Sequence, residues 1–334
     1  MKTTFRRALA TVLSVLLLMA AVPLSVWPTV TVSAASTATF ADGTAYEYTV
    51  NSGTATITKY IGTATVVDIP ESLDGSTVTT IGNDAFRDTE ITAVTIPDMV
   101  TRIENYAFAY CYALSDVTLP KALTYLGRRA FANAAIESIE IPKSLDSCDK
   151  YSSYSYTFEG KTYSVYDGPF FCCENLKSAT FEEGSTQIAQ NLFAGAVALE
   201  SVVIPDTVTV IENSAFRDCL RLTDVIIGQA VTTISDYAFN SCYSLRSVVL
   251  PNMVTRINAY AFESCRNLQS VTLSKSLTDL GRRAFAYTAI ESIEIPKSLD
   301  ICDKYSDYSY EFEGKSYSVY DGPFFCCENL KSAT

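Results

Sequence analysis

The 334-residue chain contains no histidine. Histidine is the usual general base of Ser-His-Asp and Cys-His catalytic sites, and it is the commonest metal ligand in proteins. The ten cysteines also lack the Cys-x-x-Cys spacing that is typical of zinc sites. Enzymes that use pairs of carboxylates are not excluded by these absences. We nevertheless expect a protein that is not an enzyme, with no catalytic, cofactor-binding or metal-binding residue.

Positive charge and long helical patterns are also scarce. The chain has 25 lysines and arginines against 37 aspartates and glutamates, which gives a formal net charge of −12. Nucleic acids and anionic membranes bind basic surfaces, so neither is expected as a partner. No stretch keeps the apolar period of an α-helix for more than about two turns, and little regular helix is therefore expected.

Residues 1–35 have the pattern of a signal peptide. A basic start is followed by an almost wholly apolar stretch at residues 8–24 and by small residues at 33–35. We predict that the segment directs export and is removed near Ser36. The alternative is an uncleaved anchor, because the apolar stretch approaches membrane-spanning length. No later segment is apolar enough to span a membrane, so the mature chain is expected outside the cell.

Phenylalanine recurs along most of the chain at intervals of 22 or 23 residues, with one interval of 39. A period between 20 and 50 residues is typical of a solenoid, in which one structural unit stacks on copies of itself. A solenoid presents a long surface and usually no enclosed cleft, so binding is the first functional hypothesis and catalysis the second. The recurring residues are Phe86, Phe108, Phe131, Phe170, Phe193, Phe216, Phe239, Phe262 and Phe285.

Each position of the repeat has a physical role. Leu114, Val117 and Leu119 alternate with Asp116 and Thr118, which is typical of a short strand with one buried face. A proline ends this strand in many units, where its missing amide would interrupt a longer ladder. The fold class predicted from these columns is a repeat solenoid of about ten coils. Each coil has one short parallel strand, and stacking buries a continuous core.

The unit around Phe239 carries a longer motif, I-x-x-x-A-F-x-x-C-x-x-L-x-x-V-x-L-P, from Ile234 to Pro251. This motif resembles the BspA-like, or Treponema-type, leucine-rich repeats of bacterial surface proteins, over roughly residues 78–334. The resemblance implies a right-handed leucine-rich-repeat superhelix, secretion or surface display, and a role in adhesion or protein binding. Residues 36–77 lack the Ala-Phe pair and alternate in polarity, so we expect a β-rich N-terminal cap there.

A longer repeat contains several of the short ones. Residues 124–180 and 278–334 match at 50 of 57 positions and are 154 residues apart. Such near-identity indicates a recent duplication. Because Thr334 corresponds to Thr180, in the middle of a strand, we expect the natural chain to continue. A wall anchor or a catalytic domain would then lie beyond residue 334.

Each copy of the long repeat contains a tyrosine-rich insertion. The first alternates around Glu159-Gly160, which suits a β-hairpin turn. Tyrosine gives rigid contact area with a polar tip, a combination found in binding hot spots. These tyrosines are candidate partner-binding residues, and the alternative is that they pack the hairpin onto the solenoid. They are Tyr151, Tyr154, Tyr156, Tyr163 and Tyr166, and in the second copy Tyr305, Tyr308, Tyr310, Tyr317 and Tyr320.

Val203, Ile226 and Val249 are predicted to lie next to one another on the outward side of the strands. An exposed apolar strip on a sheet can mark an interface. The alternative is that these side chains only reflect the preference of strands for β-branched residues. We include the three residues among the candidate partner-binding positions.

Six of the ten cysteines occupy the third position after a periodic phenylalanine: Cys111, Cys173, Cys219, Cys242, Cys265 and Cys327. Alanine and threonine take this position in other coils, which favours buried thiols that pack as small apolar groups. A ladder of disulfides between coils is the alternative in an exported protein. At the base of each insertion we predict one further bridge, Cys148–Cys172 and Cys302–Cys326.

The sequence thus favours a secreted or cell-surface protein that mediates adhesion or protein recognition through an extended repeat surface. The expected partner is a protein or glycan on a host matrix or a neighbouring cell, and no cofactor is expected. One alternative is the recognition arm of an exported enzyme whose catalytic domain lies beyond residue 334. Another is a purely structural envelope protein. Attachment to the cell wall would depend on a region beyond residue 334.

Overall fold

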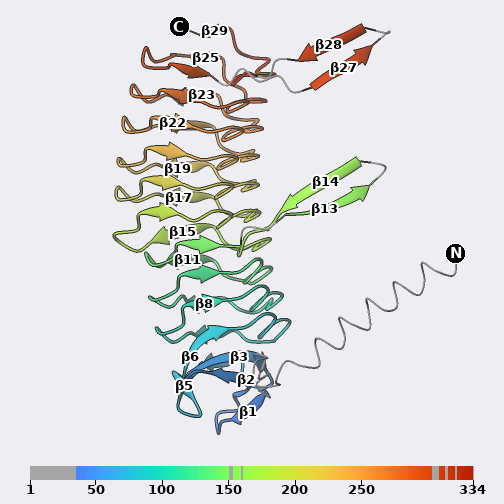
Figure 1. Ribbon diagram of the computed structural model, residues 1–334, viewed down its shortest axis with the longest axis vertical. Coiled ribbons are helices and arrows are strands. Elements are labelled where there is room, and N and C mark those ends of the chain that lie inside the picture. Colours follow the sequence, from blue (N-terminus) through green and yellow to red (C-terminus); the bar gives the residue numbers. More distant parts are fainter. Residues whose placement is uncertain are drawn as a thin grey trace, which may run out of the picture. The chain divides into compact units, whose positions relative to one another are not determined.

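The computed structural model describes residues 35–149, 153–158, 161–302, 308–312, 315–319 and 322–333. All the regular structure in these residues is β-strand, and no helix occurs among them. The chain winds into a stack of coils, drawn upright in Figure 1. Residues 1–34, which contain nearly all of the predicted signal peptide, lie outside the described residues.

One side of the stack is formed by the strands that the sequence predicted, and we call it the strand face. Neighbouring strands on it run parallel, and Val202 of one coil lies opposite Val225 of the next. The strands are β4 (Val66–Asp68), β7 (Ala93–Thr95), β9 (Asp116–Thr118), β11 (Ser138–Ile141), β15 (Ser178–Phe181), β17 (Ser201–Val203), β19 (Asp224–Ile226), β21 (Ser247–Val249), β23 (Ser270–Thr272), β25 (Ser292–Ile293) and β29 (Ser332–Ala333).

A second strand of two residues follows in nearly every coil, whereas the sequence predicted one strand per coil. Its apolar member is buried, as at Ile211 and Ile257. These strands also stack in parallel, so the solenoid has strands on two sides and not one, and each side is divided into shorter sheets. They are β8 (Arg102–Ile103), β10 (Tyr125–Leu126), β12 (Ser147–Cys148), β16 (Gln187–Ile188), β18 (Val210–Ile211), β20 (Thr233–Ile234), β22 (Arg256–Ile257), β24 (Asp279–Leu280) and β26 (Ile301–Cys302).

The N-terminal end of the stack is built differently. Antiparallel pairs join β1 (Ser36–Thr39), β2 (Ala45–Asn51) and β3 (Thr54–Tyr60). β3 then pairs in parallel with β6 (Ser76–Ile81), which also pairs with β5 (Ser72–Leu73) and with β8 of the next coil. The antiparallel strands therefore continue the sheet of the first coil. Tyr46 and Tyr48 fill the core beneath them and are almost fully buried.

The periodic phenylalanines form one column through the core. Ten rings from Phe86 to Phe324 stack in succession, with centroids 4.8 to 5.7 Å apart. The first nine are fully buried. Their contacts define nine turns of the coil, so the predicted repeat solenoid is confirmed.

The backbone around each phenylalanine explains why no helix forms there. Ser214 and Asp218, two residues on either side of Phe216, have φ values of 56° and 59°. The N–H groups of all three donate to carbonyls of the next coil, at 2.9, 2.8 and 2.9 Å. A left-handed residue interrupts a right-handed helix. The backbone therefore forms hydrogen bonds between coils at this corner, where a helix would form them within one segment.

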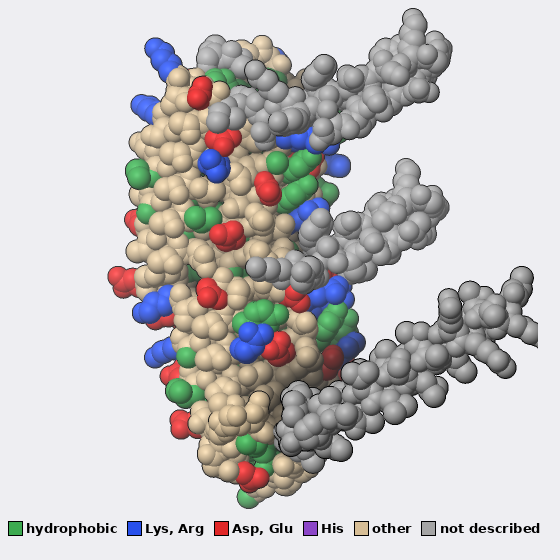
Figure 2. Space-filling view, viewed as in Figure 1, with side chains coloured by type: hydrophobic (Ala, Val, Ile, Leu, Met, Phe, Trp, Pro, Cys, Tyr) green, Lys and Arg blue, Asp and Glu red, His purple; other side chains and the backbone are tan. Residues whose placement is uncertain are grey.

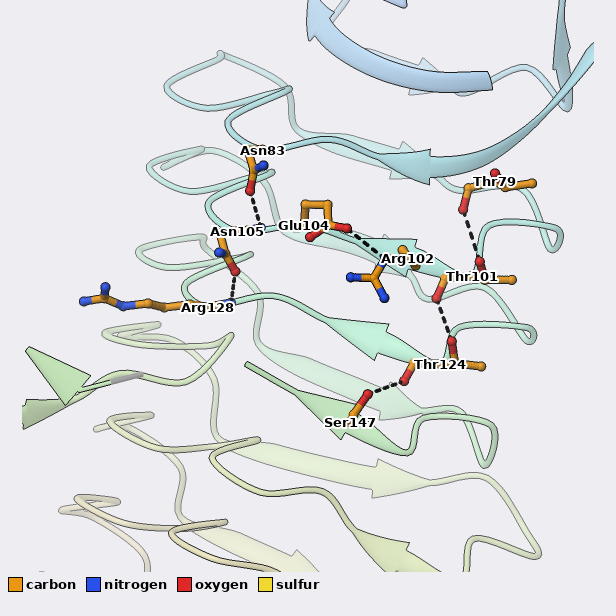
Figure 3. A network of polar contacts seen from close by, with 9 residues as sticks. All are labelled: Thr79, Asn83, Thr101, Arg102, Glu104, Asn105, Thr124, Arg128 and Ser147. Carbon is orange, nitrogen blue, oxygen red and sulfur yellow. Dashed lines mark hydrogen bonds and ion pairs between the residues drawn. The ribbon is translucent and has the colours of Figure 1, made fainter. Parts of the chain in front are cut away.

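Polar side chains form a second ladder along the outside of the stack (Figure 3). The hydroxyl of Thr124 donates to the carbonyl oxygen of Thr101 at 3.2 Å, and Ser147 donates to that of Thr124 at 3.3 Å. The Asn105 side-chain oxygen accepts from the Arg128 amide at 2.7 Å. The same threonine carbonyls also accept backbone N–H groups of the next coil, so the side-chain bonds add to the backbone hydrogen bonds between coils at these corners.

Candidate recognition surfaces

The two insertions contain antiparallel hairpins, as the sequence predicted. β13 (Ser153–Phe158) pairs with β14 (Lys161–Tyr166), and β27 (Tyr308–Phe312) pairs with β28 (Lys315–Val319). Within the described residues each hairpin is a separate two-stranded sheet. The Glu159-Gly160 turn lies outside the described residues, as do Tyr151, Tyr305 and Tyr320.

The strand register pairs the hairpin residues in the same way in both copies. Tyr156 lies opposite Tyr163, Tyr154 opposite Val165 and Phe158 opposite Lys161. Tyr166 lies opposite Ser153. In the second hairpin, Tyr310 lies opposite Tyr317, Tyr308 opposite Val319 and Phe312 opposite Lys315. Each ribbon therefore has a tyrosine pair at the same register.

Charged side chains fix the base of the first hairpin. Asp167 directly follows β14, and its side chain is fully buried. It accepts two hydrogen bonds from Arg128, at 2.9 and 2.7 Å, and forms an ion pair with Arg129 at 2.5 Å. At the other end, the Asn191 amide donates to the carbonyl oxygen of Asp149 at 3.1 Å. The preceding and the following coil thus both anchor the hairpin.

Arginine and tyrosine side chains line the corner of the stack beside these bases, and we call this surface the Arg–Tyr edge. Its first group consists of Arg87, Tyr106, Arg128 and Arg129. Its second consists of Arg217, Tyr237, Tyr260, Arg282 and Arg283. In Figure 2, hydrophobic and basic side chains gather along one long edge of the stack.

Within the Arg–Tyr edge, tyrosine rings stack on one another and arginines lie over the rings. The rings of Tyr237 and Tyr260 lie 4.7 Å apart and nearly parallel, with Arg217 above the first ring at 4.8 Å. In the first group, Arg87 lies 5.4 Å from the Tyr106 ring. Cation–π pairs of this kind hold the flexible arginines in place. The edge therefore presents fixed arginine and tyrosine surfaces, the residue types that dominate binding hot spots.

Acidic residues interrupt this edge. Burial raises the pKa of the Glu263 carboxyl, while Arg283, 3.5 Å away, opposes the shift. Burial likewise raises the pKa of Asp218, against the effect of Arg217. Burial alone therefore accounts for the raised pKa values, and each carboxyl pairs with an arginine on the same surface. Within the part of the chain that the structure describes, no cluster of residues could hold a metal ion.

The predicted apolar strip lies on the strand face. Val203, Ile226 and Val249 are 56, 63 and 67% exposed. Val203 pairs with Ile226 across β17 and β19, and β21 lies next to β19. The strip is therefore continuous and open to solvent.

Two matching hollows lie on the same face, where strands of neighbouring coils do not pair. The first, of about 350 Å³, lies between β9 and β11 and is lined by Lys121, Glu140, Glu182 and apolar side chains. The second, of about 170 Å³, lies between β23 and β25 with Lys275 and Glu294. They are equivalent positions of the two long repeats. Lys143 binds Glu182 at 3.1 Å beside the first hollow.

The structure corrects the predicted Cys148–Cys172 bridge, because both residues are free thiols. Cys148 takes the place of isoleucine on β12 and is buried in the core, and this burial raises the pKa of its thiol. Cys172 lies at a left-handed corner and is partly exposed. The two thiols therefore differ in burial, and they form no bond with each other. Cys326 is likewise a free thiol, which corrects the predicted Cys302–Cys326 bridge.

The cysteine column consists of buried free thiols in the three coils that carry Cys219, Cys242 and Cys265. Cys219, Cys242 and Cys265 are fully buried. Each donates from Sγ to the carbonyl oxygen of the phenylalanine in the preceding coil, at 3.2 Å. The structure therefore has the packed thiols and not the alternative ladder of disulfides.

The Arg–Tyr edge was not found by sequence reasoning, although a signal was present. Tyrosine stands two residues before the periodic phenylalanine at Tyr106, Tyr237 and Tyr260, and an Arg-Arg pair precedes Ala-Phe in each long repeat. These positions lie beside the core motif and recur at irregular numbers of coils. Only the stacking of coils shows that they form one surface.

Ten stacked coils, parallel strands on two sides and a phenylalanine core define a leucine-rich-repeat solenoid. The family model of the BspA type leucine-rich repeat region, with six copies, matches residues 79–196, 146–268, 186–313 and 232–334. These matches cover well over half of the chain. The chain therefore belongs to the BspA type leucine-rich repeat family.

Solved structures of bacterial leucine-rich-repeat proteins resemble the chain. One from Bacteroides capillosus is 35% identical, with 44% of this chain and 99% of that chain covered and a TM-score of 0.35. The leucine-rich-repeat protein of T. pallidum is 23% identical, with 67% and 87% covered and a TM-score of 0.43. A leucine-rich cell surface protein of Faecalibacterium prausnitzii is 21% identical, with 89% and 94% covered and a TM-score of 0.35.

Comparison with curated protein sequences gives no match. In the part of the chain with described structure, no helix is long and apolar enough to cross a membrane.

Proposed function

We propose that the protein is an exported recognition protein that binds a protein or glycan of a host matrix or neighbouring cell surface. The observation that carries this proposal is the tyrosine pair that the strand register forms in each hairpin, with the base of the first hairpin anchored beside the Arg–Tyr edge. An isolated two-stranded hairpin is marginally stable in water, and it gains stability when its apolar face is covered. A partner that covers the tyrosines would supply that burial.

The Arg–Tyr edge extends the same surface. Asp167 joins the exit of the first hairpin to Arg128 and Arg129 of this edge, so hairpin and edge are mechanically connected. Arginine and tyrosine lose little conformational freedom on binding when they are already stacked. The recognition surface would therefore combine hairpin tyrosines with the preordered side chains of Tyr237 and Tyr260.

Export is supported by the basic and apolar pattern of residues 1–35. Adhesion follows from the family as an expectation, because leucine-rich repeats provide extended surfaces for protein binding. Enzyme activity finds no support in the described residues, where the shifted carboxyls pair with arginines. The proposed role is thus binding without catalysis.

The experiment deletes residues 150–166 and 304–320 together and measures binding to extracellular matrix deposited by cultured cells and to washed bacterial cells. Each deletion removes 17 residues and shortens a coil of 39 to one of 22, a length already present between Phe86 and Phe108. The solenoid is therefore expected to stay folded. The intact chain should bind one of these surfaces saturably, and the deletion should weaken binding at least tenfold.

A matched control replaces Tyr112, an exposed tyrosine outside the insertions and the Arg–Tyr edge, with serine. This variant should bind as the intact chain does. Saturable binding that survives the double deletion unchanged would overturn the role of the hairpins. The absence of saturable binding to either surface would overturn recognition of such partners altogether.

A further inference from the structure

The outward side chains of the strand face form a row that reads the same in both directions. Ile226 stands at its centre, with Val203 and Val249 on either side. Beyond these lie exposed threonines and then exposed glutamates. The whole row, in chain order, is Glu140, Thr180, Val203, Ile226, Val249, Thr272 and Glu294.

Two side chains of opposite charge lie beside this row, at equal distances from the coil of Ile226. Glu200 precedes β17 and Arg246 precedes β21, so they lie one coil before and one coil after the coil of Ile226. Both are exposed. Strands stack about 4.8 Å apart, so the Cα atoms of the two residues lie about 10 Å apart, with Thr223 of the middle coil between them. Among the described residues neither side chain forms an ion pair, so each charge is available to a partner.

A two-fold axis through the Ile226 coil, parallel to the strands, relates these groups to one another. It places Val203 on Val249 of a second copy, and Ile226 on its own counterpart. The same operation brings Glu200 of each copy opposite Arg246 of the other, so two equivalent pairs form. A two-fold interface uses the same patch on both subunits and requires such self-complementarity.

We propose that the strand face joins two copies of this chain in an antiparallel, two-fold symmetric dimer centred on Ile226. The chemistry that recognises the partner is the apolar strip, flanked by two Glu200–Arg246 ion pairs between the copies. The Arg–Tyr edge and the hairpin bases lie on another side of each coil. This dimer therefore stands independently of the proposed ligand recognition, and the two are tested separately.

The expected dimer is weak. Five coils of about 4.8 Å, each contributing a five-residue segment of about 16 Å that includes the three-residue strand, give a footprint of about 400 Å² per copy. The total of about 800 Å² is below the standard interface size. A dissociation constant on the order of 100 µM suits such an area. Asp224 of each copy meets Asp224 of the other near the axis, and at the ends of the row Glu140 of each copy faces Glu294 of the other. These like-charge contacts oppose association. Serine takes the same position in both neighbouring coils, at Ser201 and Ser247.

The test is sedimentation equilibrium of the full chain from about 10 µM to 1 mM at low salt, without any ligand. Glu200→Arg and Arg246→Glu should each weaken the dimer at least tenfold, because each places like charges opposite one another twice. The double swap, Glu200→Arg with Arg246→Glu, should restore the natural affinity. An equimolar mixture of the two single variants should also restore it, since every contact in the mixed dimer pairs opposite charges.

Asp224→Ser should tighten the dimer about tenfold, and Ile226→Ser should abolish it. Circular dichroism and urea midpoints verify that each variant is folded. Three outcomes would overturn the proposal: a chain that stays monomeric up to 1 mM, single charge variants that associate as the natural chain does, or a mixture that fails to recover association. The mixture is the sharpest arm, because charge reversal of a surface with an unrelated partner would not be rescued in this way.

Discussion

The stacked phenylalanines carry the core, because each ring contacts the rings of the coils before and after it. Phe239 is fully buried, with neighbouring rings 5.1 Å away on both sides. Phe239→Ala should lower the free energy of unfolding by about 3–5 kcal/mol through lost burial and a cavity. Urea unfolding followed by circular dichroism measures this loss. Met253→Ala, at a 56% exposed residue, should cost less than about 0.5 kcal/mol, and equal losses in the two variants would contradict the account.

The cysteine column makes a separate prediction about reactivity. Burial raises the pKa of the Cys219 and Cys242 thiols well above the ordinary value, which leaves them neutral and poorly nucleophilic. Thiol alkylation of the native chain, read by mass spectrometry, should modify the exposed Cys326 and leave Cys219 and Cys242 unmodified until urea is added. Disulfides between the buried cysteines of consecutive coils would contradict this prediction.

The core could be predicted from the sequence residue by residue, but the Arg–Tyr edge could not. Buried columns such as Phe216 and Ile234 repeat because every coil has the same space to fill. The Arg–Tyr edge depends on which side chains of neighbouring coils come into contact at the left-handed corners. The stacking of Tyr237 on Tyr260 and of Arg217 on Tyr237 follows from the backbone of two or three coils together, and no single repeat encodes it.

Among the elements, the first hairpin depends on its base. Asp167→Asn removes the charge that pairs with Arg128 and Arg129 and leaves two arginines facing a neutral amide. Breaking such a pair costs about 3 kcal/mol when the acid is buried and the arginines are partly exposed. Amide hydrogen exchange in β14 should accelerate accordingly. Asp116→Asn, at an exposed position of β9, is the control and should leave that exchange unchanged, and equal rates in both variants would contradict the anchoring role.

The N-terminal antiparallel strands should lose stability in alkali. Burial raises the pKa of the Tyr46 and Tyr60 hydroxyls, and a hydrogen bond to Asp74 raises the pKa of Tyr48. A group whose folded pKa is raised stabilises the fold fully below its ordinary pKa, near 10 for tyrosine, and loses that contribution as the pH rises further. Tyrosine absorbance should therefore show a group that ionises only as these strands unfold. Ionisation of every tyrosine near pH 10 with the strands intact would contradict this.

The strands themselves were only partly predictable. The strand face followed from the alternation of residues such as Val117 and Thr118, because a half-buried strand has a period of two. The two-residue strands β18 and β22 were missed, since two residues show no period. They exist because Ile211 and Ile257 each stack on the equivalent residue of the next coil. The absence of a Cys148–Cys172 bridge could not be predicted either, because spacing along the chain does not show which thiol is buried in the core.

Over the whole molecule, the duplication repeats the recognition elements at a fixed spacing. The two hairpins are separated by six coils, which corresponds to about 29 Å at the usual distance between strands. Tyr106, Arg128 and Arg129 of the Arg–Tyr edge recur with the same offset of 154 residues, and so do the hollows of the strand face. Two linked sites that engage one partner surface gain avidity through effective concentration. We therefore expect the two hairpins to act as a pair.

The most direct test of this account compares dissociation rates from cell-deposited matrix or washed bacterial cells, whichever the intact chain binds. Four chains are required: intact, lacking residues 150–166, lacking residues 304–320, and lacking both. Either single deletion should raise the dissociation rate by about 10²-fold or more through loss of avidity, and the double deletion should remove most of the remaining binding. Dissociation rates that are the same for all four chains, with circular dichroism showing each solenoid folded, would contradict recognition through the paired hairpins.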